Sequence, residues 1–148
     1  MLFIELIANR IISMEKSKQN NPESILKRWV KYFNEADLDE LLDLYHSNST
    51  VLPTFVPNAL STQEQIKEYL INCANRSAAV EIDNDTIVKQ QLTENIYLLT
   101  GFYSFYFDNN RKREFKSRFT FLIDLSAEKP IQHHHSSQIS ESLFYDQM

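Results

Sequence analysis

The stretch Ile96–Phe107, with the sequence IYLLTGFYSFYF, decides the fold. It is aromatic and free of charged residues, which favours a strand. Side chains alternate along a strand, so one face carries Ile96, Leu98, Phe102 and Tyr106. The other face carries Tyr97, Leu99, Tyr103, Phe105 and Phe107. Both faces are largely apolar, whereas a strand with one face in water alternates apolar and polar residues. The stretch therefore predicts a strand that is covered on both faces.

Further strands are predicted around this one, and short polar links suit hairpins between consecutive strands. An earlier β-rich segment, Thr50–Val56, is interrupted by Pro53 and followed by Pro57, so it is predicted to be an edge strand or a bulged one. The remaining predicted strands are Ala78–Val88, Phe115–Leu125 and Ile131–Ile139.

Three helices are predicted before the four long strands. The first begins at Asn21 and Pro22, because Asn caps helices and Pro suits their first turn. The second begins at Asp37 and is predicted to end within residues 46–49. A capping box at residues 61–64 opens the third. The apolar residues at helical spacing are Ile25, Trp29 and Phe33, then Leu41, Leu44 and Tyr45, then Ile66, Tyr69, Leu70 and Cys73.

Helices followed by a meander predict an α+β fold, with the helices gathered on one face of an antiparallel sheet. A length of 148 residues fits one domain, with predicted bounds 21–140. Residues 1–20 are expected to be an N-terminal extension, either a short added helix or a start-site artefact, since Met14 is a second candidate start. Residues 141–148 are expected to form a C-terminal tail that packs through Leu143, Phe144 and Tyr145.

Composition excludes several functions. The net charge of −5 argues against nucleic acid, which favours clustered Lys and Arg. One glycine, Gly101, is too few for a P-loop or a dinucleotide-binding loop. Cys73 is the only cysteine, so an internal disulfide is impossible and a cytoplasmic location is expected. The apolar start of the chain contains Glu5 and Arg10 and is too short to span a bilayer, so no membrane partner is expected.

The second apolar face of the sheet needs a cover, because the helices can cover only one face. A symmetric homodimer is the simplest way to provide it. Self-association through the sheet is therefore expected.

The run His133-His134-His135-Ser136-Ser137 lies within the last predicted strand. Alternation places His133, His135 and Ser137 on one face and His134 and Ser136 on the other. Two histidines could share a metal ion, but the ion would need further ligands that the sequence hardly offers, and no metal or other cofactor is predicted. Two interpretations stay open: histidines hydrogen-bonded in the core or an interface, or a polar pocket for an oxygen-rich ligand.

Arg118 lies in the middle of a predicted strand, where its guanidinium allows two interpretations. Held inside the fold, it would favour a carboxylate ligand through a bidentate pair. Alternatively it forms a salt bridge across the sheet, to Glu114, Asp124 or a dimer mate.

Catalysis has only weak candidates. Ser136 and Ser137 do not lie on the sharp turn that exposes a nucleophile, and adjacent strand residues point to opposite faces. Acid–base chemistry needs an Asp or Glu that faces apolar walls. Asp43 and Asp124 are the nearest candidates, and both are expected to face water.

Several motifs resemble a known superfamily. The segments 25–29, 34–38 and 44–45 (ILKRW, NEADL and LY) resemble the opening of nuclear transport factor 2-like proteins. Ser117–Phe121 (SRFTF) and Ile131–Ser137 (IQHHHSS) are similar to bacterial relatives of the calcium/calmodulin-dependent protein kinase II association domain, a group also described as steroid-isomerase-like. The resemblance covers about residues 23–140.

The resemblance implies a cone of three helices against a curved sheet, a pocket inside it, and dimerisation through the sheet. Two positions depart from the pattern. Lys129 stands where the group usually has tryptophan, and Phe102 stands where it often has arginine, so a ligand site that relied on this arginine would lack it. Kinase activity is not implied, because the chain has no Gly-rich loop.

The leading hypothesis is a homodimeric or larger assembly module with a pocket for a small carboxylate or apolar ligand. The alternative is a small isomerase, dehydratase or cyclase that uses an acid–base pair in the pocket. A third hypothesis is a regulator of a larger partner. A buried carboxylate beside Tyr32, Tyr69 or Tyr103 would favour the enzyme, and a pocket closed by aromatics or lined without an acid would favour the module. The predicted ligand-binding residues are Tyr103, Arg118, His133, His134, His135 and Ser136.

Overall fold

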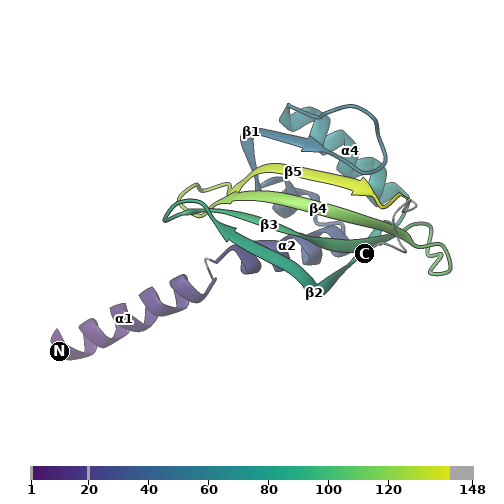
Figure 1. Ribbon diagram of the computed structural model, residues 1–148. Coiled ribbons are helices and arrows are strands. Elements are labelled where there is room, and N and C mark those ends of the chain that lie inside the picture. The colour runs from purple at the N-terminus through teal and green to yellow at the C-terminus, as the bar shows by residue number, and fades with distance from the viewer. Residues whose placement is uncertain (1, 20, 141–148) are drawn as a thin grey trace, which may run out of the picture.

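The computed structural model describes residues 2–19 and 21–140, with the backbone alone for residues 12–19. Helices and strands follow the predicted order, with an additional helix at the start (Figure 1). The helices are α1 (Leu2–Gln19), α2 (Pro22–Glu35), α3 (Leu38–Leu42) and α4 (Gln63–Asn75). The strands are β1 (Tyr45–Leu52), β2 (Ala79–Gln91), β3 (Ile96–Tyr106), β4 (Phe115–Asp124) and β5 (Ile131–Gln138).

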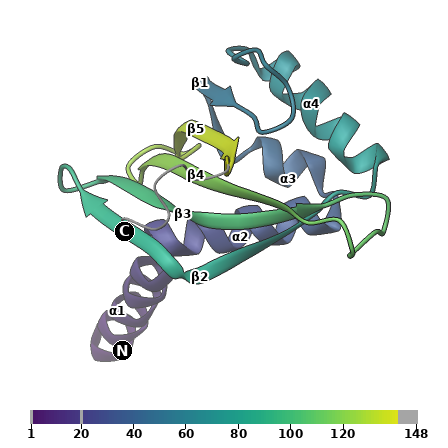
Figure 2. The ribbon, with the colours of Figure 1, turned by 45° about the vertical axis from the view of Figure 1, so that its right-hand side comes forward.

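The strands form one five-stranded sheet in the order β1-β5-β4-β3-β2. Strands β2 to β5 are an antiparallel meander, as predicted. The prediction of a wholly antiparallel sheet is wrong, however, because β1 pairs with β5 in parallel. The α+β class is confirmed, and the curved sheet with α2 against it and α3 and α4 beside it forms an open cone (Figure 2).

Strand β1 begins earlier than predicted. The predicted end of the second helix, residues 46–49, belongs to β1, and the helix ends at Leu42. The chain joins the sheet directly after this helix, because the Leu44 carbonyl accepts a hydrogen bond from the Ile131 N–H at 2.8 Å. The prediction of a bulged edge strand is confirmed, since β1 lies at one edge and its register shifts between Tyr45 and Thr50.

Side-chain caps fix where the helices begin. Asn21 caps α2, and its Oδ1 accepts from the Ser24 N–H at 2.7 Å. The box that opens α4 lies one residue later than predicted, with Thr62 as the cap and Gln65 as its reciprocal partner.

The two outermost strands each have one residue whose outward backbone groups are bonded to another part of the chain. Strand β1 forms a two-bond bridge with Leu60, in which Val51 and Leu60 each donate to the other's carbonyl at 2.8 and 2.7 Å. Strand β2 is held by the side chain of Asn34 in α2. Its amide donates to the Val80 carbonyl at 3.0 Å and accepts from the Val80 N–H at 2.7 Å. The amide therefore occupies the place of a neighbouring strand at this residue.

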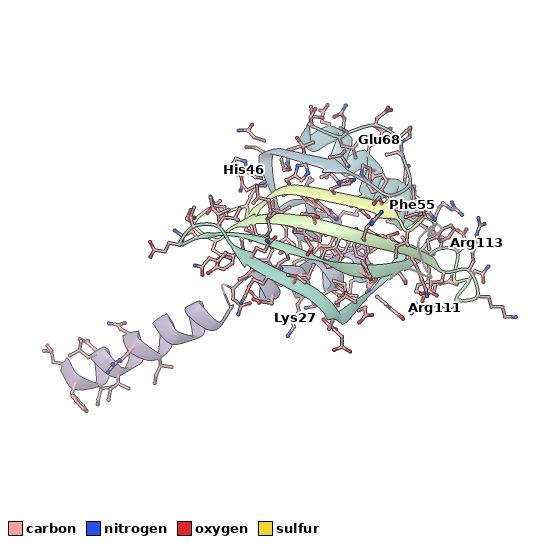
Figure 3. All side chains as sticks on the ribbon, viewed as in Figure 1. Lys27, His46, Phe55, Glu68, Arg111 and Arg113 are labelled. Carbon is pink, nitrogen blue, oxygen red and sulfur yellow. The ribbon has the colours of Figure 1, made fainter. Side chains whose placement is uncertain are left out.

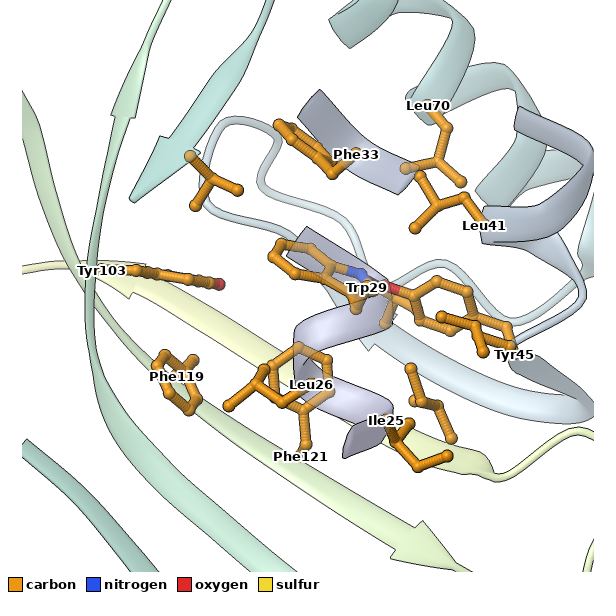
Figure 4. Packing of buried hydrophobic residues seen from close by; sticks show 14 of the residues in the cluster. Ile25, Leu26, Trp29, Phe33, Leu41, Tyr45, Leu70, Tyr103, Phe119 and Phe121 are labelled. Atoms are coloured by element: carbon orange, nitrogen blue, oxygen red, sulfur yellow. Dashed lines mark hydrogen bonds between the residues drawn. The ribbon is translucent and has the colours of Figure 1, made fainter. Parts of the chain in front are cut away.

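The core lies between α2 and the inner face of the sheet (Figure 4). Trp29 is its centre: the indole is 2% exposed and stacks with Phe33 and Tyr103 at 5.2 and 6.0 Å between ring centroids. The inner face is carried by alternate residues of β3 and β4, as predicted, and the residues between them face outward. The buried members of these two strands include Leu99, Tyr103, Phe105, Phe119, Phe121 and Ile123.

Helix α1 extends away from the rest of the protein (Figures 1 and 2). Residues 2–11 are exposed along their whole length, and the apolar side chains of Leu2, Phe3 and Ile4 are 71–77% exposed. In the described part of the chain, no helix combines the length and apolarity that a membrane span requires. The predicted packing of Leu143, Phe144 and Tyr145 lies outside the described residues.

Gly101 is predicted to resist substitution because Phe119 occupies the space beside it. A Cβ at this position would lie 2.8 Å from Phe119 Cζ, and Phe119 is itself held by Tyr103 and Phe121. Gly101→Ala should therefore lower the free energy of unfolding by about 1–3 kcal/mol, measured by urea denaturation. Thr100→Ala, on the outer face of the same strand, is the control and should cost less. Equal losses for the two variants would contradict the close contact.

Candidate functional site

The histidine run divides between the two faces of β5. His134 and Ser136 point into the cone and are 4% and 5% exposed. His135 is exposed on the outer face, and His133 is half-buried there. The predicted alternation of these residues is therefore confirmed, and the structure shows that His134 is the histidine that faces inward.

His134 is bonded through both of its ring nitrogens. Its Nδ1 lies 2.9 Å from the Tyr45 hydroxyl, and its Nε2 lies 3.1 Å from the Tyr103 hydroxyl. The Trp29 indole N–H donates to the Tyr45 hydroxyl at 2.8 Å, and the two rings meet in this way in Figure 4. The imidazole also stacks on Phe121, with ring centroids 3.9 Å apart. A continuous hydrogen-bond chain thus joins α2, β1, β5 and β3.

The chain is uncharged at neutral pH. Burial lowers the pKa of His134 to about 3, and the neighbouring His133 and His135 act in the same direction. Burial also raises the pKa of the Tyr45 and Tyr103 hydroxyls above their ordinary value. A neutral imidazole has one N–H, so it donates to one tyrosine and accepts from the other. A general acid or base works best with a pKa near the working pH, and none of these groups has one.

Little space remains beside this chain. The adjoining cavity has a volume of about 20 Å³ and is lined by residues that include Thr54, Tyr69 and Ser136. This volume suffices for about one water molecule. Thr54 Oγ1 and Ser136 Oγ are hydrogen-bonded to each other across the wall of the cavity.

Aromatic rings form a cluster around Phe55. Phe55, in the connection after β1, lies near the start of β4 (Figure 3). Its ring makes edge contacts with Phe105, Phe107 and Phe115 at 4.8–5.4 Å between centroids. These contacts hold the connection after β1 against Phe105 of β3 and Phe115 of β4.

Carboxylates lie away from the cavity beside His134. Its lining, within the described residues, contains neither Asp nor Glu. Asp43 is exposed and lies 3.5 Å from the Lys129 ammonium, and Asp124 accepts from the Ser126 hydroxyl at a hairpin. Cys73 is buried, which raises the pKa of its thiol to about 11 and makes it a poor nucleophile. Among the described residues, no three His, Cys, Asp or Glu side chains are placed to hold a metal ion.

Arg118 is not inside the cone. It lies on the exposed outer face of β4, because its neighbours Ser117 and Phe119 take the inward positions. With Phe102, His135 and other residues it lines a shallow depression of about 360 Å³. The predicted salt bridges to Glu114 and Asp124 do not form within the described chain.

The six predicted ligand-binding residues therefore divide into two groups. Tyr103, His134 and Ser136 meet inside the cone, whereas Arg118, His133 and His135 lie outside it. Sequence reasoning missed Trp29, Tyr45 and Thr54 as polar partners of the inner group. Trp29 and Tyr45 were predicted to be buried, and a buried N–H or O–H needs a partner, but the sequence gives no sign that β1 lies beside β5.

We predict that His134 makes the stability of the protein depend on pH. The unfolded chain takes up this proton near the ordinary histidine pKa of about 6.5, whereas the folded chain resists it down to about 3. The contribution of neutral His134 to the free energy of unfolding is therefore complete above about pH 6.5. As the pH falls below this value, the free energy of unfolding decreases by up to about 1.4 kcal/mol per pH unit.

The test compares His134→Gln with His135→Gln on the outer face, by urea denaturation between pH 7.5 and about 5. The slope should flatten only in His134→Gln. The ring signals of His134 in the wild-type protein should also stay constant over this range in NMR spectra. A His134 signal that titrates near pH 6 would refute the neutral, buried imidazole.

Comparison with known proteins defines the fold. No protein-family model and no curated protein sequence matches the chain. A solved candidate calcium/calmodulin dependent protein kinase II association domain from Xanthomonas campestris has a TM-score of 0.71 at 21% identity, over 81% of this chain and 86% of that one. A candidate dehydratase of the NTF2-like family from Streptomyces avermitilis has a TM-score of 0.70 at 11% identity, over 86% and 99%. An NTF-2-like protein of unknown function from Shewanella oneidensis has a TM-score of 0.61 at 17% identity, over 77% and 93%. The similarity at these identities concerns the fold, and the fold of this chain is that of the nuclear transport factor 2-like proteins.

Proposed function

We propose that this protein is an association domain that forms a homodimer through the outer face of its sheet and performs no catalysis in the cone. The observation that carries the proposal is Phe102, which is 47% exposed in the middle of that face. An aromatic ring in this position is costly in water and suits the centre of an interface.

Apolar residues surround Phe102 on the outer face. Val88 on the neighbouring strand is 56% exposed, and Ile139 just after β5 is 44% exposed. Leu98 and Leu122 are half-buried further along the same side. Helices α2 to α4 lie on the other face of the sheet, so a second copy of the chain is the cover that the proposal supplies.

The interior supports an association domain over an enzyme. Pockets for small molecules usually measure about 300–1,000 Å³, far more than the 20 Å³ beside His134. The cavity is lined without an acid, and its imidazole and phenols are held neutral. Two kinds of structural neighbour are a candidate association domain and a candidate dehydratase, and the interior favours the first. The predicted small ligand would accordingly need more space than this cavity offers.

Phe102→Asp is expected to convert the dimer into a monomer. It places two carboxylates at the centre of the interface, since each copy contributes one, and weakens dimerisation by at least about 100-fold. Sedimentation of the full chain at micromolar concentrations measures this. Val56→Asp, at an exposed apolar residue in the connection after β1, is the matched control and should remain dimeric. A wild-type protein that sediments as a monomer at tens of micromolar would overturn the proposal.

A further inference from the structure

The outer face carries a row of residues in which charge changes sign across the sheet. Asp83 on β2 pairs in register with Phe102 on β3, which pairs with Arg118 on β4. Directly paired residues in a sheet point to the same side, so all three side chains stand on the outer face. The order across the row is acid, aromatic ring, base.

The next row repeats the pattern. Glu81 on β2 pairs with Ser104 on β3, which pairs with Lys116 on β4. The outer face therefore has Glu81 and Asp83 on β2 and Lys116 and Arg118 on β4, with β3 between them. Glu114, just before β4, accepts a hydrogen bond from the Ser104 hydroxyl at 2.6 Å. A second depression, of about 380 Å³, lies over these two rows and shares Phe102 with the depression beside Arg118.

Three of these four charges make no ion pair within the described chain, although Asp83 accepts a hydrogen bond from the Asp85 N–H at 3.2 Å. Glu81 is paired with Arg111 at 2.9 Å. Asp83, Lys116 and Arg118 make no ion pair with any described residue. Strands β2 and β4 are two strand spacings apart, about 10 Å, and Phe102 stands between Asp83 and Arg118. The two charges are thus kept apart in one copy while both remain available to another.

We propose that a second copy of this chain docks on the outer face about a two-fold axis that runs along β3 past Phe102. This inference rests on the proposed homodimer and specifies its geometry. Rotation about such an axis places β2 of each copy over β4 of the other. Asp83 of each copy then lies against Arg118 of the other copy, which gives two equivalent contacts, and the two Phe102 rings face each other. Stacked sheets lie about 10 Å apart, a gap that a long arginine side chain and an aspartate can span together.

Charge selects this axis over the other two-fold arrangement that stacks the same faces. An axis perpendicular to the strands would place β2 over β2 and β4 over β4. Asp83 would then lie near Asp83 of the second copy, and Arg118 near Arg118. Like charges in an interface cost several kcal/mol, whereas the axis along β3 turns the same four groups into two ion pairs. Phe102 excludes water from both pairs, which strengthens them.

Charge reversal tests the pairing in the full chain. Asp83→Arg alone and Arg118→Asp alone each create two like-charge contacts, and each should weaken dimerisation by at least about 100-fold in sedimentation. The double variant, with both reversals in one chain, should regain the dimer. An equimolar mixture of the two single variants should form a heterodimer, because both contacts are complementary again. Lys112→Asp, at an exposed residue of the β3–β4 hairpin, is the control and should stay dimeric. If the double variant stays monomeric while both single variants are folded, the pairing of Asp83 with Arg118 is wrong.

Cross-linking tests the axis separately from the existence of a dimer. Asp83→Cys and Arg118→Cys are mixed at concentrations where sedimentation shows dimers and are treated with a short bis-maleimide. Position 83 should cross-link to position 118, and Asp83→Cys alone should not cross-link to itself. The native Cys73 is 7% exposed and is a poor target.

The outcomes separate the two proposals. A dimer in which position 83 cross-links to itself overturns the axis along β3 and leaves the proposed association domain standing. A wild-type protein that never dimerises overturns both. A third outcome is that Arg118→Asp abolishes the dimer while Asp83→Arg leaves it intact. Arg118 would then contact a different acid, and this result also overturns the inferred geometry.

Discussion

The fold depends on satisfying one buried imidazole. A polar ring without partners in an apolar core costs several kcal/mol, and His134 avoids this cost only because two tyrosines reach it from different strands. One of them, Tyr45, is in turn held by the Trp29 indole of α2. A single chain of hydrogen bonds thus fixes α2, β1, β3 and β5 relative to one another. The position of β1 beside β5 brings the Tyr45 hydroxyl to the imidazole.

Much of this architecture could be predicted from local sequence signals. The four long strands were predicted within three residues of their observed ends, because aromatic alternation and polar hairpins are local properties. The caps at Asn21 and near Thr62 are local in the same sense. Strand β1 was placed five residues late because its first residue, Tyr45, pairs with Ile131, more than eighty residues away, and residues 46–49 lie in the irregular part of the register. No pattern within a short window reports such a contact.

The site was predictable only in part for the same reason. Alternation alone separates His134 from His135, but it does not say which of them faces the helices. For Arg118 the sequence left two interpretations open, a carboxylate ligand inside the fold or a salt bridge across the sheet. Its neighbours Ser117 and Phe119 already argue against the first, since a small residue and an aromatic one take the inner positions. The interior of the cone is thus neutral and nearly filled, whereas the outer face of the sheet carries charged and apolar side chains. The outer face is therefore the better candidate for a functional surface.

The two edge strands of the sheet each have a residue whose backbone is already bonded, and this bears on the addition of further strands. Open strand edges are the usual templates for fibrils and domain-swapped polymers. Here Leu60 takes up the Val51 backbone of β1, and the Asn34 amide takes up the Val80 backbone of β2. At these two residues the backbone is not available to an added strand, while the broad outer face of the sheet stays free for a contact that closes on itself.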